Sequence, residues 1–144
     1  MPDTAITSTL KARTILLSVW ISFFFINGVI ILFLYFQNWI ERDNFMAALK
    51  QLSVSYSPYL GAIFSFYLAK RKKISEQSEN KTTFALALIC SLVWNILILV
   101  FLLPPLSGTG AIETSLQNIN DTASLLSWLI AGAIGYYFVG IASG

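Results

Sequence analysis

Long apolar runs alternate with short polar stretches along the chain, a pattern typical of a protein that crosses a membrane repeatedly. The apolar runs cover residues 14–40, 54–69, 83–103 and 122–143. A transmembrane helix needs about 20 predominantly apolar residues, and the shorter second run ends at a basic cluster that marks a membrane boundary. The pattern predicts an all-α integral membrane protein with four transmembrane helices, built as a single membrane domain over residues 1–144.

Two connecting segments repeat apolar positions at helical spacing. Phe45, Leu49 and Leu52 share one face of a helix, and a matching segment carries Ile112 and Ile119 around Leu116. The spacing predicts a short amphipathic helix in each connection, lying on the outer surface of the membrane.

The two halves of the chain resemble one another, which predicts an internal repeat of residues 11–70 and 81–141. Asn27 to Leu34 (NGVIILFL) aligns with Asn95 to Leu102 (NILILVFL), and a Gly-Ala-Ile triplet at 61–63 aligns with another at 132–134. The predicted architecture is therefore two similar helical hairpins, related as parallel repeats by a pseudo-twofold axis along the membrane normal.

The distribution of basic residues sets the orientation, because cytoplasmic loops are enriched in Lys and Arg. Placing the N-terminus inside leaves only Arg42 and Lys50 on the outer side. It also places Trp39, Tyr56 and Tyr59 in an aromatic belt at the outer interface. We expect both termini in the cytoplasm, and short loops with this charge bias fit a bacterial inner membrane. The basic residues placed inside are Lys11, Arg13, Lys70, Arg71, Lys72, Lys73 and Lys81.

The cluster Lys70, Arg71, Lys72 and Lys73 is a strong topology signal and a candidate contact for anionic lipid or for an acidic partner. It is too short and too close to the membrane to predict nucleic-acid binding. The partners expected from the sequence are therefore the lipid bilayer and other membrane proteins.

Small residues recur every fourth position on several helices, which predicts close helix packing in lipid. The stripes occur on the second and fourth runs, and a third contains Ala87, Ser91 and Asn95. We expect the first two to pack within the chain, with contact to another copy as the alternative. They comprise Ser57, Gly61, Ser65 and Ala69 on the second run and Ser127, Ala131 and Gly135 on the fourth.

Composition narrows the chemistry that the chain can perform. Hydrophobic residues make up 56% and charged residues 11%, against about 25% charged in soluble domains. The chain has no histidine and a single cysteine, Cys90, which we expect to be a buried small apolar residue. Histidine-ligated metal sites and internal disulfides are excluded, and we predict no catalytic residue, metal or cofactor.

Asn27 and Asn95 are the strongest polar candidates, because each lies near the middle of an apolar run. A carboxamide at that depth needs a hydrogen-bond partner, and the two could satisfy one another between helices. The alternative is that they line a polar constriction between copies of the chain.

Two functions follow from these features. The first is a non-enzymatic membrane subunit that packs with itself as a homo-oligomer or joins a larger membrane partner. The alternative is an oligomeric passive pore or membrane effector, of a defence or lysis type, lined by Asn and Ser.

Overall fold

The computed structural model describes residues 3–69 and 81–140. These residues form four helices and no strand: α1 (Asp3–Phe36), α2 (Arg42–Ala69), α3 (Lys81–Leu106) and α4 (Ile112–Gly140). The prediction of an all-α chain with four helices is confirmed. Lys70 to Lys73 and the end of the fourth apolar run, residues 141–143, lie outside the described residues.

Two of the four helices contain a segment long and apolar enough to cross a membrane. The segments are Lys11–Phe36 of α1 and Lys81–Leu106 of α3. Each has 26 residues, which corresponds to about 39 Å of helix and exceeds a hydrocarbon core of about 30 Å.

The expectation of separate surface helices in the connections is wrong. α2 runs without interruption from Arg42 and α4 from Ile112, so each predicted surface segment is the first part of a long helix. Their apolar positions pack inside the bundle, where Leu52, Ile112 and Ile119 are buried. Burial against neighbouring helices, not against a membrane surface, explains the helical spacing of these residues.

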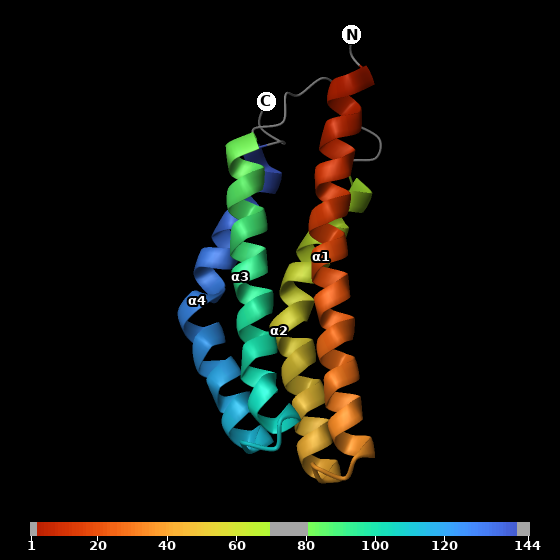
Figure 1. Cartoon of the computed structure of the whole chain (residues 1–144). Helices are drawn as coiled ribbons and strands as arrows, with labels where there is room; N and C mark the ends of the chain where they lie inside the picture. The colour runs from red at the N-terminus through yellow and green to blue at the C-terminus, as the bar shows by residue number, and fades with distance from the viewer. Residues whose placement is uncertain (1–2, 70–80, 141–144) are drawn as a thin grey trace.

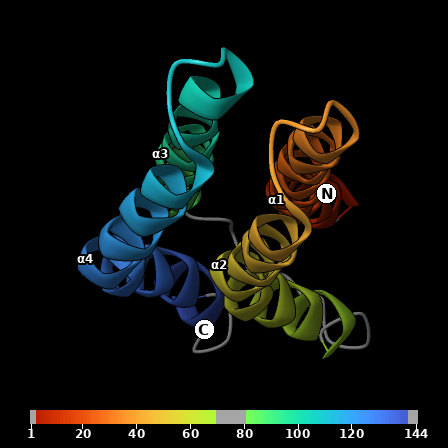
Figure 2. The same cartoon turned by 90° about the horizontal axis from the view of Figure 1, so that it is seen from below.

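The four helices form a bundle in which each contacts two neighbours. α1 packs against α2 and α3, and α4 packs against α3 and α2. α1 and α4 therefore lie at opposite corners, as do α2 and α3 (Figure 2). α1 and α3 begin at the same end of the bundle and run parallel, while the two short turns lie at the opposite end (Figure 1).

The two turns have the same backbone hydrogen bonds. In the first, Asn38 N–H donates to Tyr35 O and Trp39 N–H to Leu34 O, and the corresponding bonds of the second join residues 108 to 105 and 109 to 104. Asn38 (φ 57°) and Gly108 (φ 71°) occupy the left-handed position of each turn. This pairing is a Schellman motif, in which a left-handed residue ends the helix and satisfies its last carbonyl groups.

The buried core changes character along the bundle. The part nearest the turns is aliphatic, the middle is aromatic and polar, and the far end is aromatic. Aliphatic packing near the turns leaves a residual cavity of about 10 Å³ beside Ser55. The three parts contain Ile31, Leu52, Ile98 and Leu102 near the turns, Trp20, Tyr56, Tyr59 and Trp94 in the middle, and Phe84, Tyr137 and Phe138 at the far end.

Gly108→Ala should destabilise the protein by about 1 kcal/mol, because a side chain at positive φ brings its Cβ close to backbone oxygen. The matched control is Asn38→Gly, which keeps the same conformation in the other turn without a Cβ and should leave the free energy of unfolding unchanged or slightly higher. Both are measured by reversible denaturation in detergent. Equal stability of the wild type and Gly108→Ala would contradict the left-handed conformation at residue 108.

Candidate functional site

Asn27, Tyr56 and Asn95 form a chain of hydrogen bonds in the middle of the bundle. Asn27 Nδ2 donates to the Tyr56 hydroxyl at 2.8 Å, and this hydroxyl donates to Asn95 Oδ1 at 2.8 Å. The side chains of all three are completely buried. The bonds link α1, α2 and α3, and the second one crosses the diagonal between two helices that are not neighbours.

The network continues from Asn95 along α3 and back to α1. Asn95 Nδ2 donates to the Ser91 carbonyl oxygen at 2.7 Å. The Ser91 hydroxyl accepts a hydrogen bond from Trp20 Nε1 at 3.0 Å and donates to the Ala87 carbonyl oxygen at 2.7 Å. α1 and α3 are therefore joined twice, through Tyr56 and through Ser91.

Aromatic rings surround the hydrogen-bonded chain. The Trp20 ring lies 5.6 Å from that of Tyr56 and 4.8 Å from that of Tyr59, measured between centroids. Tyr59 also contacts Trp94 across the diagonal at 5.9 Å and donates from its hydroxyl to the Ser127 carbonyl oxygen of α4 at 3.3 Å. The Tyr59 hydrogen bond thus connects α4 to the three helices that Tyr56 links.

Some buried polar atoms near this network have no hydrogen-bond partner among the described residues. They include Asn27 Oδ1, Ser55 Oγ and Trp94 Nε1. An unpaired buried polar atom costs about 1–3 kcal/mol, so the two bonds made by the Tyr56 hydroxyl offset part of the cost of burying the two carboxamides.

The two asparagines are joined through a tyrosine and not by a direct hydrogen bond, because each of them bonds to the Tyr56 hydroxyl. Their equivalence in the repeat is not supported by the turns, whose matching residues Asn38 and Gly108 are 70 positions apart, whereas Asn27 and Asn95 are 68 apart. Both helices, α1 and α3, are uninterrupted between the asparagine and the turn. Asn95 therefore lies two residues, or about 3 Å, farther from its turn than Asn27 lies from its own. Tyr56 spans this offset.

The expectation of an outer aromatic belt is wrong for two of its three members. Trp39 is 53% exposed in the first turn, but Tyr56 is 0% and Tyr59 6% exposed. Sequence reasoning assigned these tyrosines to a membrane interface because tyrosine is common there. The signal that could have placed Tyr56 inside is the pair of apolar-run asparagines, because a hydroxyl group can both accept from one carboxamide and donate to the other.

The small-residue stripes differ in direction. Ala87, Ser91 and Asn95 of α3 are completely buried, so this stripe packs inside the bundle. Ser57, Gly61 and Ser65 of α2 are exposed, and a Cβ atom added at Gly61 would have no neighbouring atom within 4 Å. Ala69 ends α2. On α4, Ala131 is exposed, while Ser127 and Gly135 are half-buried. The expectation that the α2 stripe packs within the chain is therefore wrong for Ser57, Gly61 and Ser65, and the alternative, contact with another copy, stays a prediction.

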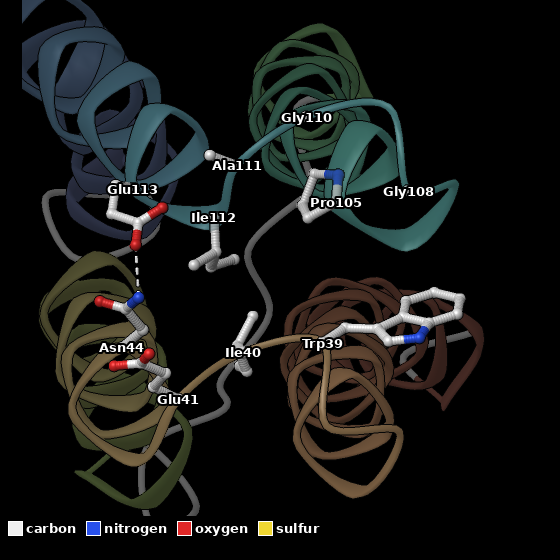
Figure 3. A pocket seen from close by; sticks show the side chains of 10 residues that line it. All are labelled: Trp39, Ile40, Glu41, Asn44, Pro105, Gly108, Gly110, Ala111, Ile112 and Glu113. Atoms are coloured by element: carbon white, nitrogen blue, oxygen red, sulfur yellow. Dashed lines mark hydrogen bonds between the residues drawn. The ribbon is translucent and has the colours of Figure 1, made fainter.

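An open cleft of about 560 Å³ lies between the two turns (Figure 3). Ile40 and Ile112 point toward each other at its centre, and Asn44 Nδ2 donates a hydrogen bond to Glu113 Oε1 at one side, while Trp39 extends away from this pair. No group of three or more metal-ligating side chains occurs among the residues that the structure describes. The bond between Asn44 and Glu113 fastens α2 to α4 at this end.

Protein-family models, curated proteins and solved structures were compared with the chain, and none matches it.

Tyr56→Phe should lower the free energy of unfolding by about 1–2 kcal/mol, because both carboxamides lose their shared partner while the ring stays in place. Tyr59→Phe is the matched control: it removes one longer bond to a carbonyl oxygen and should cost less. Denaturation in detergent micelles measures both. If the two variants were equally stable, the Tyr56 hydroxyl would not hold the network together.

Proposed function

We propose that the chain is a multi-pass membrane protein with four transmembrane helices and both termini in the cytoplasm, acting as a non-enzymatic subunit. In this role it packs with copies of itself or with a larger membrane partner. Large apolar side chains are exposed along α1 and α3, including Phe25, Val29, Ile89 and Val93. Extended apolar surface of this kind suits lipid and not water.

The observation that carries this proposal is the parallel arrangement of the two most apolar helices. α1 and α3 are neighbours and begin at the same end of the bundle (Figure 1). If both cross the membrane in the same direction, the chain between them has to return across it. α2 has 28 residues, about 42 Å, which is long enough to make that return. α4, with 29 residues, then crosses after α3.

Charge supports the same orientation. Lys11 of α1 and Lys81 of α3 lie at the end of the bundle opposite the turns, which is the cytoplasmic side in this proposal. A bacterial inner membrane is the proposed location. The matching hydrogen bonds of the two turns support two similar hairpins, with repeats over residues 11–70 and 81–141.

The buried polar network favours a packing subunit over a pore. In the pore alternative Asn27 and Asn95 line a path between copies, whereas both are completely buried inside one copy and bonded to Tyr56. In lipid, where burying apolar surface contributes little to helix association, hydrogen bonds between helices stabilise the bundle. The asparagines already have this role within the chain.

Cysteines placed at Gln37 and Ser107, one in each turn, should react with a membrane-impermeant maleimide from the same, outer side. Both positions are exposed, and Cys90→Ala provides the background. A protein in which only α1 and α3 crossed, with α2 on the outer surface, would place the two turns on opposite sides. Labelling of one cysteine only in sealed cells, and of both after lysis, would therefore contradict four spans.

The native mass of the complex, purified gently from its own membrane, tests the subunit role. We expect a mass above that of one 16.0 kDa chain, from a closed set of copies or from one copy held by a larger protein. Every co-purifying protein is identified by mass spectrometry. A stable monomer in lipid nanodiscs, with no co-purifying protein, would contradict the proposed role.

A further inference from the structure

The outward faces of α2 and α4 differ in chemistry from those of α1 and α3. Along α1 and α3 the exposed side chains are mostly large and apolar. Along α2, Ser53, Ser57, Gly61 and Ser65 interrupt the exposed apolar residues Val54 and Phe64, and along α4, Ser124 stands beside the exposed Leu125, Trp128 and Leu129. The small and polar positions gain little from contact with lipid and allow a helix of another molecule to approach closely.

A pair of opposite charges lies on this side. Lys50 of α2 and Asp121 of α4 are both exposed, and neither forms an ion pair with another residue in the ranges 3–69 and 81–140. Lys50 is eight residues beyond the first residue of α2, and Asp121 is nine beyond the first residue of α4. Since both helices leave the turns at the same end, the two charges lie at nearly the same depth, about 12–14 Å from the turns.

The shapes on the two helices also correspond at equal depth. Trp128, sixteen residues beyond the start of α4, is 71% exposed. Ser57, fifteen residues beyond the start of α2, is small and exposed, and Gly61 follows one turn later with no neighbouring atom within 4 Å of an added Cβ. α4 therefore has the large Trp128 side chain at the depth at which α2 has the small residues Ser57 and Gly61.

A twofold symmetry axis between two copies would bring these matching positions of α2 and α4 into contact. Two copies in one membrane have the same orientation, so a twofold axis relating them lies along the membrane normal. When both copies present the side formed by α2 and α4, that rotation sets α2 of one copy against α4 of the other at the same depth. Opposite charges and complementary shapes then meet twice in one interface.

We propose that the outward faces of α2 and α4 bind a second copy of this chain, with Lys50 of each copy facing Asp121 of the other and Trp128 packing against Ser57 and Gly61 of the other. The inference rests on the proposed membrane arrangement, which gives both copies the same orientation. The ion pairs lie at the rim and select the partner and its register, while the small residues allow close approach of the backbones.

Cross-linking between two differently tagged full-length chains tests the geometry. Both carry Cys90→Ala, one carries Lys50→Cys and the other Asp121→Cys, and they are coexpressed and treated in the membrane with a short bifunctional maleimide. We expect a cross-linked pair that carries both tags. The matched control combines Val29→Cys with Val93→Cys, exposed positions of α1 and α3, and should give no product. Absence of the mixed product, or a product formed by Lys50→Cys chains alone, would overturn the proposed interface.

Charge reversal tests the contact itself. Lys50→Asp should weaken dimer association in nanodiscs about fivefold at low salt, and adding Asp121→Lys in the same chain should restore it. Equal weakening by the single and double variants would overturn the pairing. The labelling of the turns at Gln37 and Ser107 is measured on the same samples, so loss of the dimer with the turns still on one side is distinguished from failure of the membrane arrangement.

Discussion

The rest of the bundle depends on the two hydrogen bonds that the hydroxyl group of Tyr56 forms. This group accepts a hydrogen bond from Asn27 and donates one to Asn95, so a single atom binds carboxamides from two other helices. In the membrane arrangement that we propose, the helices gain little from burying apolar surface against one another, which leaves shape and hydrogen bonds to fix their positions. By joining α2 to α1 and, across the diagonal, to α3, this group sets the depth and rotation of three helices at once.

The rotation of α2 that Tyr56 requires also decides what the outside of the bundle presents. In a helix with 3.6 residues per turn, positions on one side of the axis fix those on the other. With Tyr56, Tyr59 and Ile63 turned inward, Ser57 and Gly61 have to face outward. The polar core and the small outer face of α2 are therefore two consequences of one helix orientation, and a change that rotated α2 would alter both.

Sequence patterns predicted the four helices and drew attention to the two asparagines, but they did not predict the inward or outward direction of most residues. Apolar helices have a weak amphipathic signal, because side chains facing lipid and those facing the core are equally apolar. A small-residue stripe is similarly ambiguous: that of α3 packs inside, and that of α2 faces outward. Tyr56 was misplaced for the same reason, since a tyrosine in an apolar run suits either a membrane interface or a buried partner.

The closed polar core also constrains how a pore could arise from this chain. A path between copies needs polar groups that face outward, and Asn27 and Asn95 are enclosed by their own bundle. Outward polar side chains occur on α1 at Ser18 and Ser22, and on α2 and α4 at positions that include Ser53, Ser57 and Ser124. A conducting assembly built on α2 and α4 would use the same side that we assign to the second copy. The outward side of α2 and α4 cannot both pack closely against a second copy and line a water-filled path. The opposite charges of Lys50 and Asp121 favour close packing.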